Sequence, residues 1–311
     1  MFYAFDKATG EVRWSYDIRK DGKQTSFHGN PLITDDLILI GTDHSCAPDG
    51  VGHVYAFERN TGKVRWKYRT TSVPTDIVRI GENVYFGSFQ DNWYALKLRT
   101  GELVWKFSTG ATNDQCHFVR SPVADHTYLY LTGLDGFIYA LDALSGRMAW
   151  KRKLSASAST ALALKDKMLF VGTSDNHIYR LNTETGNTVA ELSVEALPLG
   201  RITLTTDGLM VFLDNSSERY GFVVSLTTDL KPIWRQKFSP EWASERPNMW
   251  GESVIVGNCR GEVAALSAVD GTSQWKLSLK GCIRSIGNSD HRLFIGVQEG
   301  TIHAYEFPPK H

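Results

Sequence analysis

The sequence predicts an all-β protein, a seven-bladed β-propeller built from four-stranded antiparallel blades. Three observations predict this fold: a hairpin segment recurs along the chain, further strand-like segments precede most copies, and no segment keeps a helical period for more than a turn or two. Because the repeats run through the whole length, we expect residues 1–311 to form a single domain.

The recurring hairpin runs from an alanine through a turn glycine to a tryptophan, and its first copy reads AFDKATGEVRW. The strong copies lie at residues 4–14, 56–66, 95–105 and 140–150, and weaker copies lie at 180–190, 225–234 and 265–275. A glycine suits this turn because the turn needs positive φ. The glycines of the strong copies are Gly10, Gly62, Gly101 and Gly146.

The tryptophans are expected to hold the blades together. Wedge-shaped sheets arranged around an axis need a bulky ring of one blade against a small residue of another, so the tryptophans belong to the core between blades. The six docking tryptophans are Trp14, Trp66, Trp105, Trp150, Trp234 and Trp275.

Further strands, named A and B here, precede the hairpin strands C and D. The A strands are expected to begin near residues 29, 75, 120, 160, 201, 246 and 285, and their number sets the blade count at seven. The copies recur at roughly 40 to 50 residues, the spacing of four-stranded blades.

The chain ends are expected to close the ring. The last blade has A, B and C strands but no tryptophan-bearing D strand, and Glu11–Tyr16 is a D strand without A and B. We expect the N-terminal strand to complete the C-terminal blade, which removes an exposed edge. Phe2–Asp6 is then a surplus strand that competes with Ile302–Glu306, as in a truncated eight-bladed ancestor or a chain that begins inside a repeat.

The pattern AxDxxTGxxxW, followed by a B strand ending in Gly-Ser or Gly-Thr and an Asp-Gly turn, resembles the PQQ-like (pyrrolo-quinoline quinone) repeat family over essentially the whole chain. That family includes quinoprotein dehydrogenases and the outer-membrane assembly factor BamB. The resemblance implies the fold and says little of function, because the motif residues belong to the scaffold.

A quinoprotein enzyme of this family would hold PQQ with calcium beneath a pair of adjacent cysteines. The four cysteines here, Cys46, Cys116, Cys259 and Cys282, include no adjacent pair and no CxxC motif. They favour neither a zinc motif nor a disulfide framework. We therefore expect no cofactor and no metal, with PQQ and calcium disfavoured.

Charge and hydropathy narrow the classes of partner that the chain is expected to bind. Lys plus Arg and Asp plus Glu both number 34, so no overall field attracts nucleic acid. No apolar run approaches the roughly 20 residues that span a bilayer, so we expect no membrane insertion. We expect a monomer. Its compartment is periplasmic or otherwise extracytoplasmic if a leader was removed, and cytoplasmic if not.

The D-to-A and B-to-C loops, which share one face called the top, carry the irregular insertions and are the expected functional face. Aligning the A strands places Arg120, Arg201 and Arg284 in one column, and Arg246 in the next. These guanidinium groups could capture a carboxylate or phosphate at the mouth of the central channel, or they could pair with Asp76, Glu245 and carbonyls to fill a polar channel. The same face holds His28 and His117, which stand either in a His/Cys metal cluster or as incidental loop residues.

These features predict a non-catalytic binding or scaffold propeller that holds a protein, a peptide or a small anionic ligand. A degenerate quinoprotein-type oxidoreductase, or another propeller enzyme that uses His117 or His28 for proton transfer, is the alternative. A third hypothesis is an engineered or fragment protein selected only for folding. No nucleophile motif, paired carboxylates or phosphate loop appears in the sequence, which disfavours the enzyme.

Overall fold

The computed structural model places most of the chain. It describes residues 1–22, 24, 26–44, 50–111, 119–215, 217, 220–238, 247–289 and 291–306. The chain divides into two compact units: a first unit of Met1–Ser157 with Thr183–Gly186, and a second unit of Ala158–Asn182 with Asn187–His311. Among the residues described, all regular structure is β-strand except one short 3-10 turn, η1 (Ile18–Asp21), so the all-β class is confirmed.

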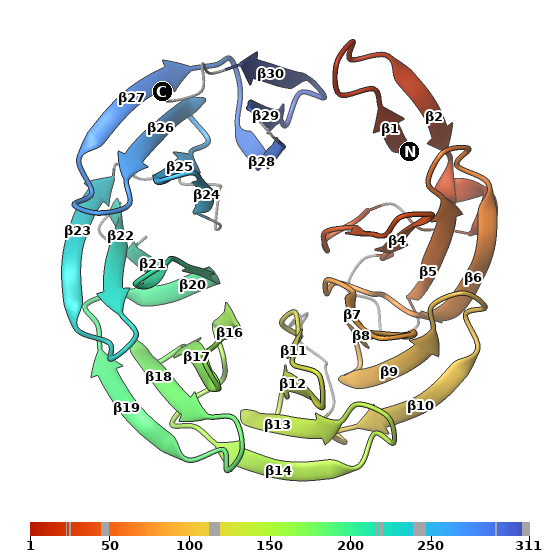
Figure 1. Ribbon diagram of the computed structural model, residues 1–311, viewed down its shortest axis with the longest axis horizontal. Helices are drawn as coiled ribbons and strands as arrows, with labels where there is room; N and C mark the ends of the chain where they lie inside the picture. The colour runs from red at the N-terminus through yellow and green to blue at the C-terminus, as the bar shows by residue number, and fades with distance from the viewer. Residues whose placement is uncertain are drawn as a thin grey trace. The chain divides into compact units, whose positions relative to one another are not determined.

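The first unit contains a two-stranded sheet and three four-stranded antiparallel sheets (Figure 1). In every one of them the strands follow one another in chain order. The strands are β1 (Phe2–Phe5) and β2 (Val12–Tyr16); β3 (Leu32–Ile33), β4 (Leu37–Gly41), β5 (Val51–Glu58) and β6 (Val64–Thr71); β7 (Val78–Ile80), β8 (Asn83–Ser88), β9 (Asn92–Lys97) and β10 (Leu103–Ser108); and β11 (Val123–Ala124), β12 (Tyr128–Thr132), β13 (Phe137–Asp142) and β14 (Met148–Lys153).

The second unit repeats this plan, with one five-stranded and one three-stranded sheet. Its strands are β15 (Thr160–Ala161); β16 (Ala163–Lys165), β17 (Met168–Thr173), β18 (His177–Asn182) and β19 (Thr188–Ser193); β20 (Leu197–Leu204), β21 (Gly208–Asn215), β22 (Tyr220–Thr227) and β23 (Pro232–Phe238); β24 (Asn248–Trp250), β25 (Ser253–Gly257), β26 (Glu262–Ser267) and β27 (Ser273–Ser278); and β28 (Ile283–Ser289), β29 (Arg292–Val297) and β30 (Ile302–Glu306).

The predicted A strands correspond to β3, β7, β11, β16, β20, β24 and β28. One segment differs in detail, because the predicted strand near residue 160 is split. Thr160 and Ala161 form β15, which pairs in parallel with Gly200 and Arg201 of the next sheet, while Ala163–Lys165 begin their own sheet as β16. The Thr160 hydroxyl holds this split in place by accepting a 2.8 Å hydrogen bond from the Gly172 N–H.

The N-terminal D strand is β2, and its hydrogen-bonded neighbour is β1. The last sheet has three strands, in the order β28-β29-β30. The described residues therefore form eight sheets, of which seven have three or more strands. Closure by β2 and a count of seven blades stay predictions.

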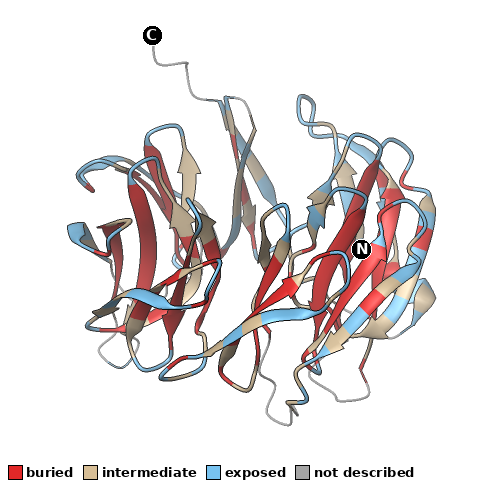
Figure 2. Cartoon of the chain, turned by 60° about the horizontal axis from the view of Figure 1, so that its bottom comes forward, coloured by how far each residue is buried: buried red, intermediate tan, exposed pale blue. Residues whose placement is uncertain are grey.

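Burial follows strand position within each sheet. All residues of β4 and β8 are buried, whereas the fourth strands carry many exposed residues, which alternate with partly buried ones in β27. Figure 2 shows buried residues concentrated on the middle strands and exposed residues along the fourth strands. Burying both faces of the second and third strands explains why these segments read as continuous apolar runs.

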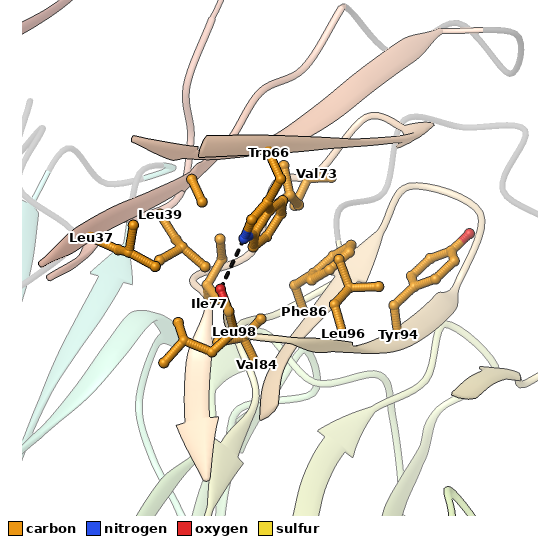
Figure 3. Packing of buried hydrophobic residues seen from close by; sticks show 12 residues of the cluster. Leu37, Leu39, Trp66, Val73, Ile77, Val84, Phe86, Tyr94, Leu96 and Leu98 are labelled. Atoms are coloured by element: carbon orange, nitrogen blue, oxygen red, sulfur yellow. Dashed lines mark hydrogen bonds between the residues drawn. The ribbon is translucent and has the colours of Figure 1, made fainter. Parts of the chain in front are cut away.

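Five docking tryptophans join their own sheet to the sheet that follows it. In five of the six docking tryptophans, the indole N–H donates a hydrogen bond of 2.8 to 3.0 Å to the carbonyl of the first residue after the third strand of the next sheet. The observed pairs are Trp14 with Arg59, Trp66 with Leu98, Trp105 with Ala143, Trp150 with Thr183, and Trp234 with Ala268. Figure 3 shows the Trp66 pair within its cluster of buried side chains.

The small partner of each ring in the neighbouring sheet is the turn glycine. A Cβ on Gly101 would lie 2.6 Å from the Trp66 ring, and Gly101 also has a φ of +72°. The repeat alanine instead lies beside the tryptophan within one sheet, as Ala56 does opposite Trp66. The motif therefore keeps glycine for two reasons, positive φ and ring contact, at Gly62, Gly101 and Gly146, and for positive φ at Gly10.

Candidate functional site

The predicted A-strand column contains two kinds of residue. Where it holds threonine, the side chain supports the sheet: the hydroxyls of Thr75 and Thr160 accept hydrogen bonds from the N–H groups of Gly87 and Gly172. Successive sheets of the first unit are also linked there, because Asp76 accepts from the Asn30 N–H and its own N–H donates to Ser121. Much of the column therefore serves the scaffold.

Where the column holds arginine in the second unit, the strand is irregular. The pairing register shifts between Leu199 and Thr203 in β20, which contains Arg201, and between Ile283 and Ser285 in β28, which contains Arg284. A β-bulge bends a strand and redirects its side chain. Both arginines thus stand where the A strand leaves regular pairing, a feature that the sequence did not reveal.

The predicted arginines differ in exposure. Arg284 is exposed and donates two hydrogen bonds, of 3.2 and 2.8 Å, to Oε1 of Gln298 in its own sheet. The Nε atoms of Arg120 and Arg201 are shielded from solvent. Arg120 belongs to the first unit and the other two to the second, and their convergence on one ligand stays a prediction.

His28 contacts a buried carboxylate. Its Nδ1 lies against Oδ2 of Asp43, and the Ser26 hydroxyl donates to Oδ1 of the same side chain. Asp43 is almost completely buried, whereas half of the His28 side chain is exposed. This arrangement orients the imidazole, but the serine contacts the aspartate rather than the histidine, so it is not a nucleophilic triad. His117 and Arg246 lie outside the described residues.

A disulfide joins Cys259 and Cys282, which are 23 positions apart. The expectation that the cysteines favour no disulfide framework was therefore wrong for this pair. Cys259 lies in the turn after β25 and Cys282 directly before β28, so the bond ties one sheet to the next. Spacing along the chain could not reveal it, because the two residues meet only once the blades are stacked.

Two absences hold for the part of the chain that the structure describes. No group of three or more His, Cys, Asp or Glu side chains is placed to hold a metal ion. No described helix is long and apolar enough to cross a membrane.

Sequence reasoning missed a groove in the first unit, between the start of β5, the end of β6 and the start of β9. It has a volume of about 420 Å³ and is lined by Gly50, Val51, Arg69, Thr70, Thr71, Gln90, Asn92, Tyr94 and Lys106. Two cations and no carboxylate line it. A signal was present in the sequence, because tryptophan is followed by lysine in three D strands of this unit, at Lys67, Lys106 and Lys151.

The second unit has a counterpart of about 290 Å³ between β23 and strands β26 and β27. Lys237 and Lys276 line it, as does the carboxylate of Glu262. Lys106 and Lys276 hold the same repeat position, directly after Trp105 and Trp275. The two grooves therefore lie at equivalent positions of the repeat and differ in the charge of their lining residues.

Comparison with known proteins gives a consistent result. A family model described as outer membrane protein assembly factor BamB matches residues 1–122 and 94–215. The outer membrane protein assembly factor BamB of Yersinia pestis is 24% identical over 209 residues, which cover 63% of this chain and 50% of that protein. The chain spans about half the length of the curated relatives it matches.

Solved structures share the fold at low identity. The crystal structure of BamB from Moraxella catarrhalis matches with a TM-score of 0.78 and 20% identity, covering 97% of this chain and 90% of that one. The quinohemoprotein alcohol dehydrogenase from Comamonas testosteroni matches with a TM-score of 0.73 and 13% identity, covering 95% and 67%. Since the family model covers more than half of the sequence, the chain belongs to the PQQ-like repeat β-propeller family whose model is described as outer membrane protein assembly factor BamB.

Proposed function

We propose that the protein is a non-catalytic binding scaffold that holds a protein partner through the turns between the second and third strands of its sheets. One observation carries the proposal. Five of the turns between third and fourth strands repeat a single design, with a glycine packed against a docking tryptophan, whereas the second-to-third turns differ from sheet to sheet. Variable loops on a rigid scaffold are where binding residues concentrate.

The partner is inferred by analogy with the named relatives. Several of them are outer membrane protein assembly factors, and one distant relative is the dehydrogenase subunit of a quinone alcohol dehydrogenase. We infer that the chain acts together with a protein assembly and that it binds no PQQ. The Cys259–Cys282 disulfide supports an extracytoplasmic location, because such bonds persist in oxidising compartments.

Site-specific photo-crosslinking tests which turns meet the partner. A photoreactive amino acid at Ser174 or Arg260, in second-to-third turns, should capture a protein in the cells that make this chain. The matched positions Glu184 and Asp270, in third-to-fourth turns of the same two sheets, should capture none. Equal capture from both sets, or capture from the third-to-fourth turns alone, would contradict the proposal.

We infer further that residues 1–311 act as one ring of seven blades, which β2 completes beside β30. The three-stranded last sheet and the two-stranded first sheet support this inference, because together they supply a full set of strands with one to spare. Deleting residues 302–311 should then lower the thermal midpoint of the whole chain, since the N-terminal strand would lose its neighbour. An unchanged midpoint would refute closure.

We propose the arginine column as a second ligand site, for a small anion. The shielded guanidinium Nε atoms of Arg120 and Arg201 support it, because charged hydrogen bonds are strongest away from solvent. Replacing both residues with alanine should weaken the binding of a polyanion such as triphosphate, measured by calorimetry. An unchanged affinity would remove this site.

A further inference from the structure

The groove of the first unit is built around two cations that no described carboxylate neutralises. Arg69 and Lys106 are both exposed and line the groove from the fourth strands β6 and β10. The two other cations on β6 have acidic partners in this unit, Arg65 with Glu58 and Lys67 with Asp21. The positive charge in the groove is therefore available to a ligand.

The groove wall holds Lys106 in place. Its ammonium lies 5.5 Å from the centre of the Tyr94 ring, an arrangement that attracts a cation to an aromatic face. Tyr94 is itself buried and stacks on Phe86 at 5.2 Å between ring centres. In Figure 3 its hydroxyl points away from the cluster that contains Trp66. The ammonium group of Lys106 thus lies against a rigid aromatic side chain and needs little reorganisation to bind a ligand.

Arg69 has a neutral neighbour. It lies opposite His53 in the pairing of β6 with β5. Burial, and then the positive charge of Lys67, lower the pKa of His53. Since the ordinary value is already 6.5, the imidazole is uncharged near pH 7 and does not compete with Arg69 for an anion.

Two residues that line the groove, Thr70 and Thr71, carry buried hydroxyl groups. Among the described residues, Oγ1 of Thr70 and Oγ1 of Thr71 have no hydrogen-bond partner, although solvent does not reach them. A buried polar group left unpaired costs roughly 1 to 3 kcal/mol. A ligand whose oxygen acceptors reach either hydroxyl would recover part of this cost.

We propose that this groove binds an acidic peptide segment of a protein partner, with a carboxylate placed between Arg69 and Lys106. Two cations suit one or two carboxylates but not the several successive phosphates that nucleic acid requires for tight binding. The volume of about 420 Å³ accommodates a side chain with its neighbouring backbone, and Gln90 and Asn92 also line the groove. The inference deepens the proposed function, on which it rests, by stating the chemistry of the partner.

The test measures the fluorescence anisotropy of a labelled, extended peptide of alternating glutamate and serine in the presence of the whole chain. The double variant Arg69→Glu with Lys106→Glu should weaken binding by about tenfold, the product of two partly screened charge contacts. Thr70→Val should weaken it less, by roughly threefold. A peptide with glutamine in place of glutamate should bind about tenfold more weakly to the native chain, since it lacks the same charge contacts.

The matched control uses the groove of the second unit. Lys237→Glu with Lys276→Glu makes the same charge change in equivalent strands, beside the carboxylate of Glu262, and should leave the affinity within about twofold. Thermal melts followed by circular dichroism confirm that each variant is folded. Equal weakening by both double variants would show general charge attraction and overturn the proposal.

Inorganic phosphate and acetate distinguish a peptide site from a simple anion site. Neither should displace the labelled peptide at concentrations that leave the ionic strength unchanged, because neither reaches the whole groove. Displacement by phosphate alone at such concentrations would overturn the peptide proposal. Failure of the peptide to bind, together with crosslinking from Ser174 or Arg260, would refute this inference and leave the scaffold function standing.

Discussion

Two turns that occupy equivalent positions in their sheets are held by different kinds of interaction. The turn between β8 and β9 contains Asp91, and the turn between β25 and β26 contains Gly261 at the equivalent position. Both residues have positive φ, +54° and +82°. The backbone is therefore alike in the two turns, although one residue carries a carboxylate and the other no side chain at all.

Each turn is tied to the sheet that follows it. The carboxylate of Asp91 accepts hydrogen bonds from the Thr109 hydroxyl, from the Leu134 N–H at 2.9 Å and from the Trp93 indole at 3.2 Å. In the other turn this role falls to the Cys259–Cys282 disulfide. One fastening depends on pH and the other on redox state, so the two regions should respond to different treatments.

The largest effect is expected at the glycine. A Cβ at residue 261 would lie 1.9 Å from the Leu279 carbonyl oxygen, which is backbone and cannot turn aside. Together with positive φ, this contact should make Gly261→Ala cost about 4 kcal/mol of unfolding free energy in urea titrations. Gly251→Ala is the control, since its φ is +59° but nothing lies within 4 Å, and it should cost about 1 kcal/mol. Equal losses would mean that the close contact is absent.

Loss of the disulfide should cause the second-largest decrease in unfolding free energy. Replacing Cys259 and Cys282 with serine should lower the unfolding free energy by about 3 kcal/mol, as expected for a loop closed over 23 positions. A reductant should shift the thermal midpoint of the native chain in the same direction, and should not shift that of the double variant through this bond. A reductant-insensitive midpoint in both proteins would show that the bond does not form.

Asp91→Ala should have a smaller effect, about 2 kcal/mol, because the Leu134 N–H and the Trp93 indole lose their acceptor inside the protein. Asp166 also has positive φ, +49°, but is exposed, so Asp166→Ala should cost less than about 1 kcal/mol. Chemical denaturation of both variants measures the difference. If Asp166→Ala lowered the unfolding free energy more than Asp91→Ala, the role of Asp91 would be to relieve backbone strain and not to accept these hydrogen bonds.

The smallest effect concerns pH. Burial raises the pKa of Asp91 above its ordinary 3.8, and the hydrogen bond from Thr109 offsets only part of that rise. Between the ordinary and the raised pKa, the native state binds more protons than the unfolded state, so stability from this group falls as pH increases through that window. The stability advantage of the native protein over Asp91→Asn should therefore be larger at pH 4 than at pH 7. A larger advantage at pH 7 would reverse the assigned direction.

The fold was predictable from the sequence because each residue of the repeat has a local structural role that few other residue types can fill. Trp66 needs both a carbonyl and a ring-sized gap, and Gly101 supplies the gap while forming its turn. The candidate site was less predictable. The bulges at Arg201 and Arg284, the Cys259–Cys282 bond and the groove at Arg69 depend on which residues of neighbouring strands and sheets meet, and no single segment of the chain contains that information.

Residue-resolved NMR titration with the glutamate–serine peptide tests the binding account most directly. The backbone amide signals of Arg69, Thr70, Thr71 and Asn92 should shift progressively as peptide is added, while the indole signals of Trp66 and Trp234 remain in place because the scaffold does not move. Shifts centred on Lys237 and Lys276, or spread evenly over exposed lysines and arginines, would contradict an acidic-peptide site in the first unit.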